Sequence, residues 1–62
     1  MPYVVTFTWK GKRRCTEHIH KKGFANAMRD ALVGDNPRIV PVKDMQSCPR
    51  GFEYNKRKKW CV

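Results

Sequence analysis

The sequence predicts a small α+β domain in which a three-stranded, mostly antiparallel sheet packs against one helix in the order ββαβ. Two patterns predict this class: strand-like alternation over residues 3–9 and apolar residues at helical spacing over residues 24–33. The length supports it, because a chain of 62 residues can build little more than one sheet layer against one helix. We therefore expect a single domain over residues 1–62, with a ββαβ core at 3–43 and a loop and basic extension at 44–62.

The first strand is expected over residues 3–9, where β-branched and aromatic side chains alternate with a period of two. Gly11 follows directly, and a second strand over residues 13–20 would complete a hairpin. A three-residue loop over residues 9–11 would place Gly11 in the left-handed conformation that such loops require.

This loop decides which face of the hairpin is expected to be buried. It places Val5 opposite Cys15 and Tyr3 opposite Glu17, with Ile19 on the same face. The odd-numbered face of the first strand then becomes the core face that the helix covers. The even-numbered face is expected to be polar, and its members are Thr6, Thr8, Arg14, Thr16, His18 and His20.

The helix is expected over residues 24–33, where apolar side chains recur at positions i, i+3, i+4, i+7 and i+8. The members of this stripe are Phe24, Ala27, Met28, Ala31 and Leu32. Gly23 is expected to be the N-cap, and Gly34 the left-handed residue after the helix. Pro37 prevents the helix from resuming.

A third strand is expected over residues 38–43, which contain Ile39, Val40 and Val42. Pro41 cannot donate a hydrogen bond to a neighbouring strand, so this strand is expected at an edge. A right-handed crossover through the helix would place it beside the first strand and parallel to the second, in spatial order 2-1-3.

The C-terminal part begins with a loop over residues 44–51, indicated by its proline and glycine residues. Residues 52–62 allow two interpretations. Asn55 and Lys56 could form the turn of a short hairpin that returns at Trp60, or the segment could be a tail that Trp60 anchors.

The charge of the chain is uneven. The formal net charge is +9, with +5 over residues 10–22, +4 over residues 45–62 and zero over residues 23–44. A field of this sign raises the local concentration of polyanions and speeds encounter with them. The residues expected to contact nucleic acid or another partner are Lys10, Lys12, Arg13, Arg14, Lys21, Lys22, Lys56, Arg57, Lys58, Lys59 and Trp60.

This distribution predicts a small, basic, non-enzymatic binding protein that contacts nucleic acid mainly through the phosphate backbone. Aromatic side chains adjoin both basic clusters and could stack on exposed bases. A helix that reads the major groove is not expected, since the outer face offers mainly Asn26, Arg29 and Asp30. A hairpin tip or a flexible tail would make the contacts instead, with weak sequence specificity.

Metal binding and catalysis are not expected. Zinc sites usually contain a pair of closely spaced cysteines, which Cys15, Cys48 and Cys61 do not provide. On a strand, Cys15 and His18 would face opposite sides, as would Glu17 and the two histidines. We therefore expect no metal, no cofactor and no enzymatic activity.

The three cysteines are an odd number, which favours reduced thiols in the cytoplasm over a secreted disulfide scaffold. The sequence leaves open whether Cys48 and Cys61 are paired. The N-terminus lacks the pattern of a secretory signal. No apolar stretch approaches the roughly 18 residues of a membrane span, so no membrane partner is expected.

The order strand, strand, helix, strand over residues 3–43 resembles short phage-encoded inhibitors of host RNA polymerase. The resemblance lies in the order of elements, and no site residues follow from it. It implies an alternative function: a phage-type regulator in the host cytoplasm that inhibits a host transcription or nucleic-acid enzyme by binding an acidic surface of that enzyme.

Overall fold

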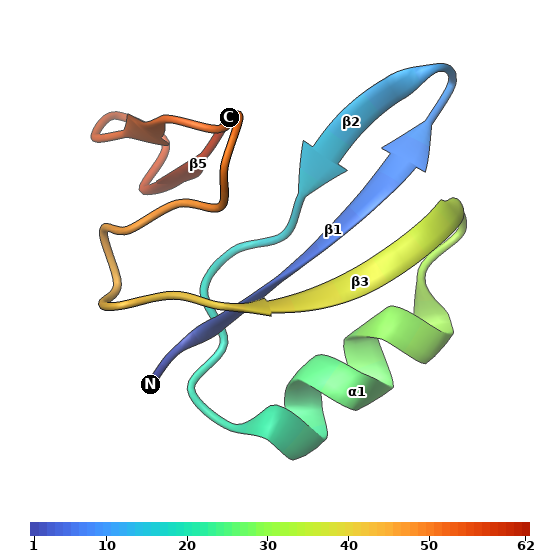
Figure 1. Ribbon diagram of the computed structural model, residues 1–62, viewed down its shortest axis with the longest axis horizontal. Helices are drawn as coiled ribbons and strands as arrows, with labels where there is room; N and C mark the ends of the chain where they lie inside the picture. Colours follow the sequence, from blue (N-terminus) through green and yellow to red (C-terminus); the bar gives the residue numbers. More distant parts are fainter.

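The structure, a computed structural model, describes residues 1–62 and contains one helix and five strands (Figure 1). The elements are β1 (Tyr3–Trp9), β2 (Lys12–Cys15), α1 (Lys22–Ala31), β3 (Asp35–Pro41), β4 (Tyr54–Asn55) and β5 (Trp60–Cys61). The main sheet has the order β2-β1-β3, and both outer strands run antiparallel to β1. α1 packs against β1 and β3. The predicted ββαβ domain with sheet order 2-1-3 is confirmed.

The turn between β1 and β2 contains two residues, Lys10 and Gly11, and both have a positive φ, of 50° and 77°. Such a turn matches the right-handed twist of the strands that it joins. It pairs Trp9 with Lys12 and Thr6 with Cys15. The predicted three-residue loop is therefore wrong, and Cys15 lies on the opposite face of the sheet from the one expected, because a shift of one residue exchanges the faces.

β2 ends at Cys15, five residues before the predicted end. The Thr16 hydroxyl oxygen accepts a hydrogen bond of 3.0 Å from the Val5 N–H, so a side chain takes the place of a backbone acceptor. The ladder resumes at a single bridge, where Tyr3 and Ile19 exchange two bonds of 2.7 Å. Between these two points the second segment has one residue more than β1, which is the arrangement of a bulge.

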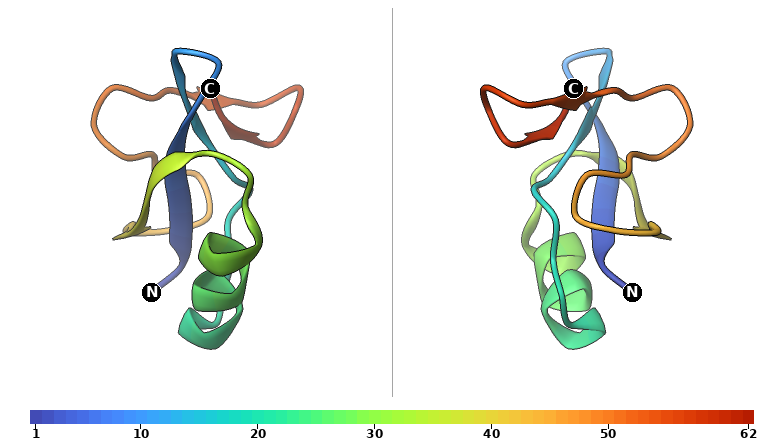
Figure 2. Two further views of the ribbon diagram at one scale, coloured as in Figure 1. Left: turned by 90° about the vertical axis from the view of Figure 1, so that its right-hand side faces the viewer. Right: turned by 90° about the vertical axis from the view of Figure 1, so that its left-hand side faces the viewer.

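Both faces of β1 are buried. Val4 and Val5, on opposite faces, are fully buried, and Thr6 is 3% exposed. Figure 2 shows α1 on one side of β1 and the segment 44–52 on the other. The prediction that the odd-numbered face alone forms the core is therefore wrong, since Val4 and Thr6 of the even-numbered face are also buried, on the side where the C-terminal segment lies (Figure 2).

The helix is rotated relative to the predicted stripe. Ala25 is fully buried, whereas Phe24, which was expected in the core, is 66% exposed. Met28 and Leu32 are half-buried, so the apolar face runs through positions 25, 28 and 32. A small residue at the centre of this face allows the helix to lie close to the sheet.

Neither predicted helix cap is correct. The N-cap is Lys21, with an extended backbone and no side-chain cap, and Gly23 lies in the first turn. The helix ends at Ala31, its C-cap Leu32 is also extended, and Gly34 does not adopt a positive φ. Gly34 is instead needed for close packing, because a Cβ there would lie 2.8 Å from Cδ2 of Phe7.

β3 begins at Asp35, three residues earlier than predicted, and it pairs only with β1, as expected for an edge strand. Its pairing with β1 shifts by one residue between Thr6 and Thr8. Asn36, with a φ of 50°, lies at this bulge, and asparagine tolerates the left-handed conformation better than most residues.

The C-terminal part forms the short hairpin that was one of the two interpretations. The β4–β5 pairing is extended by two hydrogen bonds between Glu53 and Val62, of 2.8 and 2.9 Å. The Asn55 side chain accepts hydrogen bonds from the backbone N–H groups of Arg57 and Lys58 and so stabilises the turn. Trp60 is not an anchor, because it is 42% exposed.

Cys48 and Cys61 form a disulfide across a sequence separation of 13, and Cys15 is free. The expectation that all three thiols are reduced is therefore wrong. The sequence left open whether Cys48 and Cys61 pair, because their proximity depends on the fold of the intervening hairpin. The only helix, of ten residues, is too short and too polar to span a bilayer.

Candidate nucleic-acid interface

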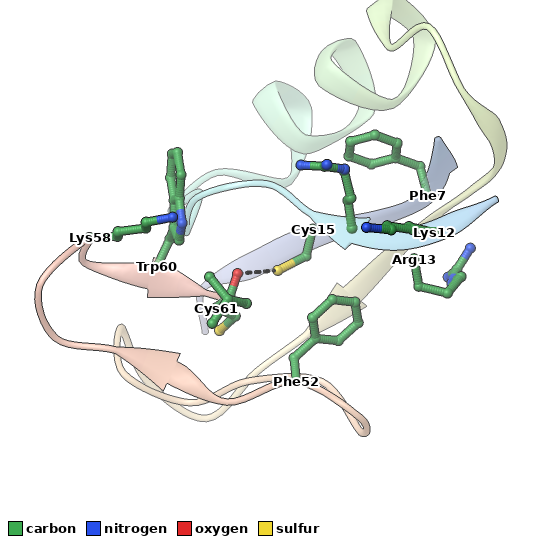
Figure 3. A pocket seen from close by; sticks show the side chains of 10 residues that line it. Phe7, Lys12, Arg13, Cys15, Phe52, Lys58, Trp60 and Cys61 are labelled. Atoms are coloured by element: carbon green, nitrogen blue, oxygen red, sulfur yellow. Dashed lines mark hydrogen bonds between the residues drawn. The ribbon is translucent and has the colours of Figure 1, made fainter. Parts of the chain in front are cut away.

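Cations from both basic clusters, which are far apart in sequence, line one hollow on the surface (Figure 3). The hollow has a volume of about 320 Å³. One side is formed by Lys12, Arg13 and Arg14 of β2, and the other by Lys58 and Trp60 of the C-terminal hairpin. Phe7 and Phe52 also line it, and sequence reasoning did not include them.

The hairpin is placed by a direct contact with β2. The Cys15 thiol donates a hydrogen bond of 3.0 Å to the carbonyl oxygen of Cys61, whose side chain is 2% exposed. Burial raises the pKa of the Cys15 thiol above 9.0, so the group is protonated at neutral pH and can act as the donor. This contact and the disulfide to Cys48 hold the hairpin beside β2.

A second contact tethers the same segment to the chain after β2. Nε2 of His18 lies 2.7 Å from the carbonyl oxygen of Ser47, which it reaches as a hydrogen-bond donor. The ring also packs edge-on against Tyr54, with the centroids 6.1 Å apart. His18 was expected on an exposed polar face; it is half-buried and joins two segments of the fold.

Arg13 is the most firmly positioned cation of the site. Its Nη1 donates to Oγ1 of Thr8 and its Nη2 donates to Oγ1 of Thr6, each over 3.0 Å. Thr6 is buried, so the guanidinium is attached to a rigid part of the sheet. The pairing of Thr8 with Arg13 brings these side chains to the same face of the hairpin.

The cations of the hollow have no acidic partner. None of its lining residues is Asp or Glu, and the only ion pair of the protein joins Arg29 to Asp30 on α1, over 3.3 Å. The positive charges at the hollow are therefore free to interact with an external anion.

The remaining predicted contact residues do not line this hollow. Lys10 lies at the tip of the β1–β2 hairpin, with its Nζ 5.7 Å from the ring centroid of Trp9. Lys21 and Lys22 lie at the start of α1, on a different part of the molecule. The other three belong to the turn of the C-terminal hairpin and are exposed there: Lys56, Arg57 and Lys59.

A second hollow, of about 480 Å³, adjoins the first and shares Arg13, Phe52 and Val62 with it. It also contains Arg38 and Arg50, which lie outside the predicted contact set. The sequence gives no local signal for them, since Arg38 depends on the register of β3 and Arg50 on how the loop returns to the sheet.

No cluster of three or more His, Cys, Asp or Glu side chains in the protein is arranged to hold a metal ion. Comparisons with protein-family models, with curated proteins and with solved structures found no match to this chain. The functional conclusion therefore rests on the geometry of the site.

Proposed function

We propose that the protein is a small, non-enzymatic nucleic-acid-binding protein that contacts mainly phosphates through the hollow between β2 and the C-terminal hairpin. The observation that supports this proposal most directly is that three cations of β2 and Lys58 of the C-terminal hairpin line one hollow that has no Asp or Glu side chain. Lysine and arginine side chains that neutralise phosphates release bound counterions, which supplies most of the free energy of non-specific binding.

The exposed aromatic side chain favours single strands over duplexes. Trp60 lies at the rim of the hollow next to Lys58, and its ring is accessible to solvent. An unpaired base can stack on such a ring while neighbouring phosphates interact with the cations. A base inside a duplex cannot do so without being extruded, which costs a few kcal/mol.

The helix does not suit the major groove. Only one of its solvent-exposed positions has a residue type that usually contacts phosphates or base edges, namely Lys22; the others are Gly23, Phe24, Ala27, Asp30 and Ala31. Binding through the β2 edge and a hairpin turn is consistent with weak sequence specificity, because phosphate contacts position a nucleic acid without reading its sequence.

A salt titration tests the proposal. The dissociation constants of the wild type and of the double variants R13A/R14A and K21A/K22A would be measured on single-stranded DNA, single-stranded RNA and duplex DNA. We expect R13A/R14A to lower the salt slope by roughly 0.7 unit for each lost contact on single strands. The control K21A/K22A removes the same charge away from the hollow and should have a smaller effect.

Binding weaker than about 10⁻⁴ M to every nucleic acid at physiological salt would contradict the proposal. That outcome would favour the alternative, a phage-type regulator that binds the acidic surface of a host transcription or nucleic-acid enzyme. The expected location is the cytoplasm, where cellular thiols reduce most disulfides. The titration would therefore be made both with and without a dithiol reductant that opens Cys48–Cys61.

A further inference from the structure

The second hollow, on the even-numbered face of the main sheet, contains three arginines from different parts of the chain. Arg13 comes from β2, Arg38 from β3 and Arg50 from the loop before the C-terminal hairpin. Arg38 pairs with Thr6 across the β1–β3 ladder, so its side chain lies on the face that this loop covers. No acidic residue lines the hollow.

The three guanidinium groups retain most of their hydrogen-bonding capacity. Arg13 uses two of its five N–H donors for Thr6 and Thr8, which leaves three. Arg38 and Arg50 make no side-chain hydrogen bond or ion pair within the protein, since the only salt bridge lies on α1. Three like charges around one hollow repel one another, and a bound anion would relieve that repulsion.

The hollow also has apolar lining residues, which include Val40, Pro49 and Phe52. Pro49 is buried and Phe52 is half-buried. Apolar walls lower the local dielectric and strengthen the attraction between a guanidinium and an anion. Phe52 also offers a ring surface beside the cations, on which a base could stack.

These features fit a phosphate monoester better than a phosphodiester. A monoester has a charge of about −1.5 to −2 at pH 7 and presents three acceptor oxygens, whereas a backbone phosphodiester has one negative charge. Because guanidinium groups bind phosphate oxygens in a planar, often bidentate geometry, three arginines suit three oxygens. The hollow is also large enough for the nucleoside attached to the phosphate.

We infer that this hollow binds a terminal phosphate monoester, and that the strand attached to it continues into the first hollow. The two hollows share Arg13 and Phe52 as lining residues, so a strand held by its end at Arg38 and Arg50 would pass toward Lys58 and Trp60. This inference rests on the proposed function for the strand, whereas the phosphate site itself could also take a free nucleoside monophosphate.

The test compares one single-stranded oligonucleotide in three forms: with a 5′-phosphate, with a 3′-phosphate and with hydroxyl groups at both ends. We expect the wild type to bind one phosphorylated form about tenfold more tightly than the hydroxyl form. The variants R38Q and R50Q should lose this ratio while they keep most of their affinity for the hydroxyl form. Both residues are exposed, so the variants should fold, which circular dichroism would verify.

The matched control is R57Q, which removes an arginine charge from a turn that does not line the hollow. It should keep the ratio between phosphorylated and hydroxyl forms. Equal affinity of the wild type for all three forms, or loss of the ratio in R57Q, would overturn the inference and leave the proposed function standing.

A second experiment tests the phosphate site independently of oligonucleotide binding, and so distinguishes failure of this inference from failure of the proposed function. Adenosine monophosphate and adenosine would be added to ¹⁵N-labelled protein, and the side-chain N–H signals of Arg38 and Arg50 followed by NMR. Shifts with the monophosphate but not with adenosine, in a protein that binds no oligonucleotide, would support the phosphate site and assign it to a free monophosphate. If the protein binds no oligonucleotide and the monophosphate causes no shifts, the inference is overturned.

Discussion

The thiol of Cys15 donates a hydrogen bond to the backbone carbonyl of Cys61, and the side chain of Cys61 is bonded to Cys48. The buried residue Cys61 therefore connects β2, at the edge of the main sheet, with Cys48 in the loop before the C-terminal hairpin. The hollow with the basic clusters exists because of this connection, since its two sides belong to β2 and to the hairpin that contains Cys61.

The disulfide is therefore expected to support both stability and binding. The double variant C48S/C61S should lose on the order of 3 kcal/mol, because a cross-link that closes a loop of about 15 residues contributes roughly that much. A domain of this size has only about 3–9 kcal/mol in total, at 0.05–0.15 kcal/mol per residue. Urea unfolding of the variant, and of the wild type with and without a reductant, measures the effect.

The reductant also supplies the control for this prediction. Reduced wild type and C48S/C61S should unfold at similar urea concentrations, and C48S/C61S should not respond to the reductant. Unchanged stability and unchanged nucleic-acid affinity after reduction would mean that the Cys15 contact and the hairpin hydrogen bonds hold the segment without the disulfide.

The raised pKa of Cys15 predicts a loss of stability at alkaline pH. The folded protein favours the neutral thiol because burial disfavours the thiolate. The contribution is fully present below the ordinary pKa of 9.0 and is lost as the pH rises through the higher pKa of the folded state. The melting temperatures of the wild type and of C15S, measured from pH 7 to 10.5, test this.

In C15S the serine hydroxyl replaces the thiol as the hydrogen-bond donor toward Cys61, and this hydroxyl does not titrate in this range. Above pH 9 the wild type should therefore lose more stability than C15S, and the difference between them isolates Cys15 from the lysines and tyrosines. Parallel curves for the two proteins would show that the thiol does not titrate differently in the folded and unfolded states.

Gly34 is expected to tolerate no larger residue. In G34A the new Cβ would lie 2.8 Å from Cδ2 of Phe7 and 3.0 Å from the carbonyl oxygen of Thr8, and the backbone at Thr8 cannot easily move within a sheet. The cost of such overpacking is typically about 1–3 kcal/mol. G23A is the matched control, because Gly23 lies in the first turn of α1 with nothing within 4 Å of a Cβ.

Alanine is favoured over glycine in a helix by about 0.5–1 kcal/mol, so G23A should be neutral or stabilising. Thermal unfolding of the two variants gives the comparison directly. Equal stability of G34A and the wild type would show that Phe7 can rotate away, and that the contact is not a constraint on the fold.

Much of the fold could be predicted from the sequence because the strong local patterns agree with it. Residues 3–9 alternate along β1, the helix lies within two residues of its predicted limits, and the crossover rule places β3 beside β1. The register could not be predicted, since two-residue and three-residue turns are both compatible with Gly11. That one-residue difference moved Cys15 to the face where it meets Cys61.

The prediction of which helix face is buried was wrong for a related reason. A stripe through Phe24 and Met28 and a stripe through Ala25 and Met28 overlap on the helix surface, and the larger residue was expected inside. The close approach of α1 to the sheet favours alanine, and Phe24 lies outside with Nζ of Lys21 5.9 Å from its ring centroid. The cations that line the first hollow could be listed from charge alone, but the positions of Arg38 and Arg50 at the second hollow required the tertiary structure.

The exposed ring of Trp60 provides the sharpest test of how single strands bind. W60A should weaken single-strand binding by about 1–3 kcal/mol, the usual contribution of one base–aromatic stack, and leave duplex binding nearly unchanged. Stability should change little, because the side chain is 42% exposed. W9A is the matched control, since Trp9 is similarly exposed, at 37%, but lies at the hairpin tip outside the hollow.

Fluorescence quenching by an oligonucleotide gives a second readout, because each variant retains a single tryptophan. Trp60, the tryptophan left in W9A, should be quenched, whereas Trp9, the tryptophan left in W60A, should not. Unchanged affinity in W60A together with a loss in W9A would place the bound strand across the hairpin tip and not in the hollow beside Lys58.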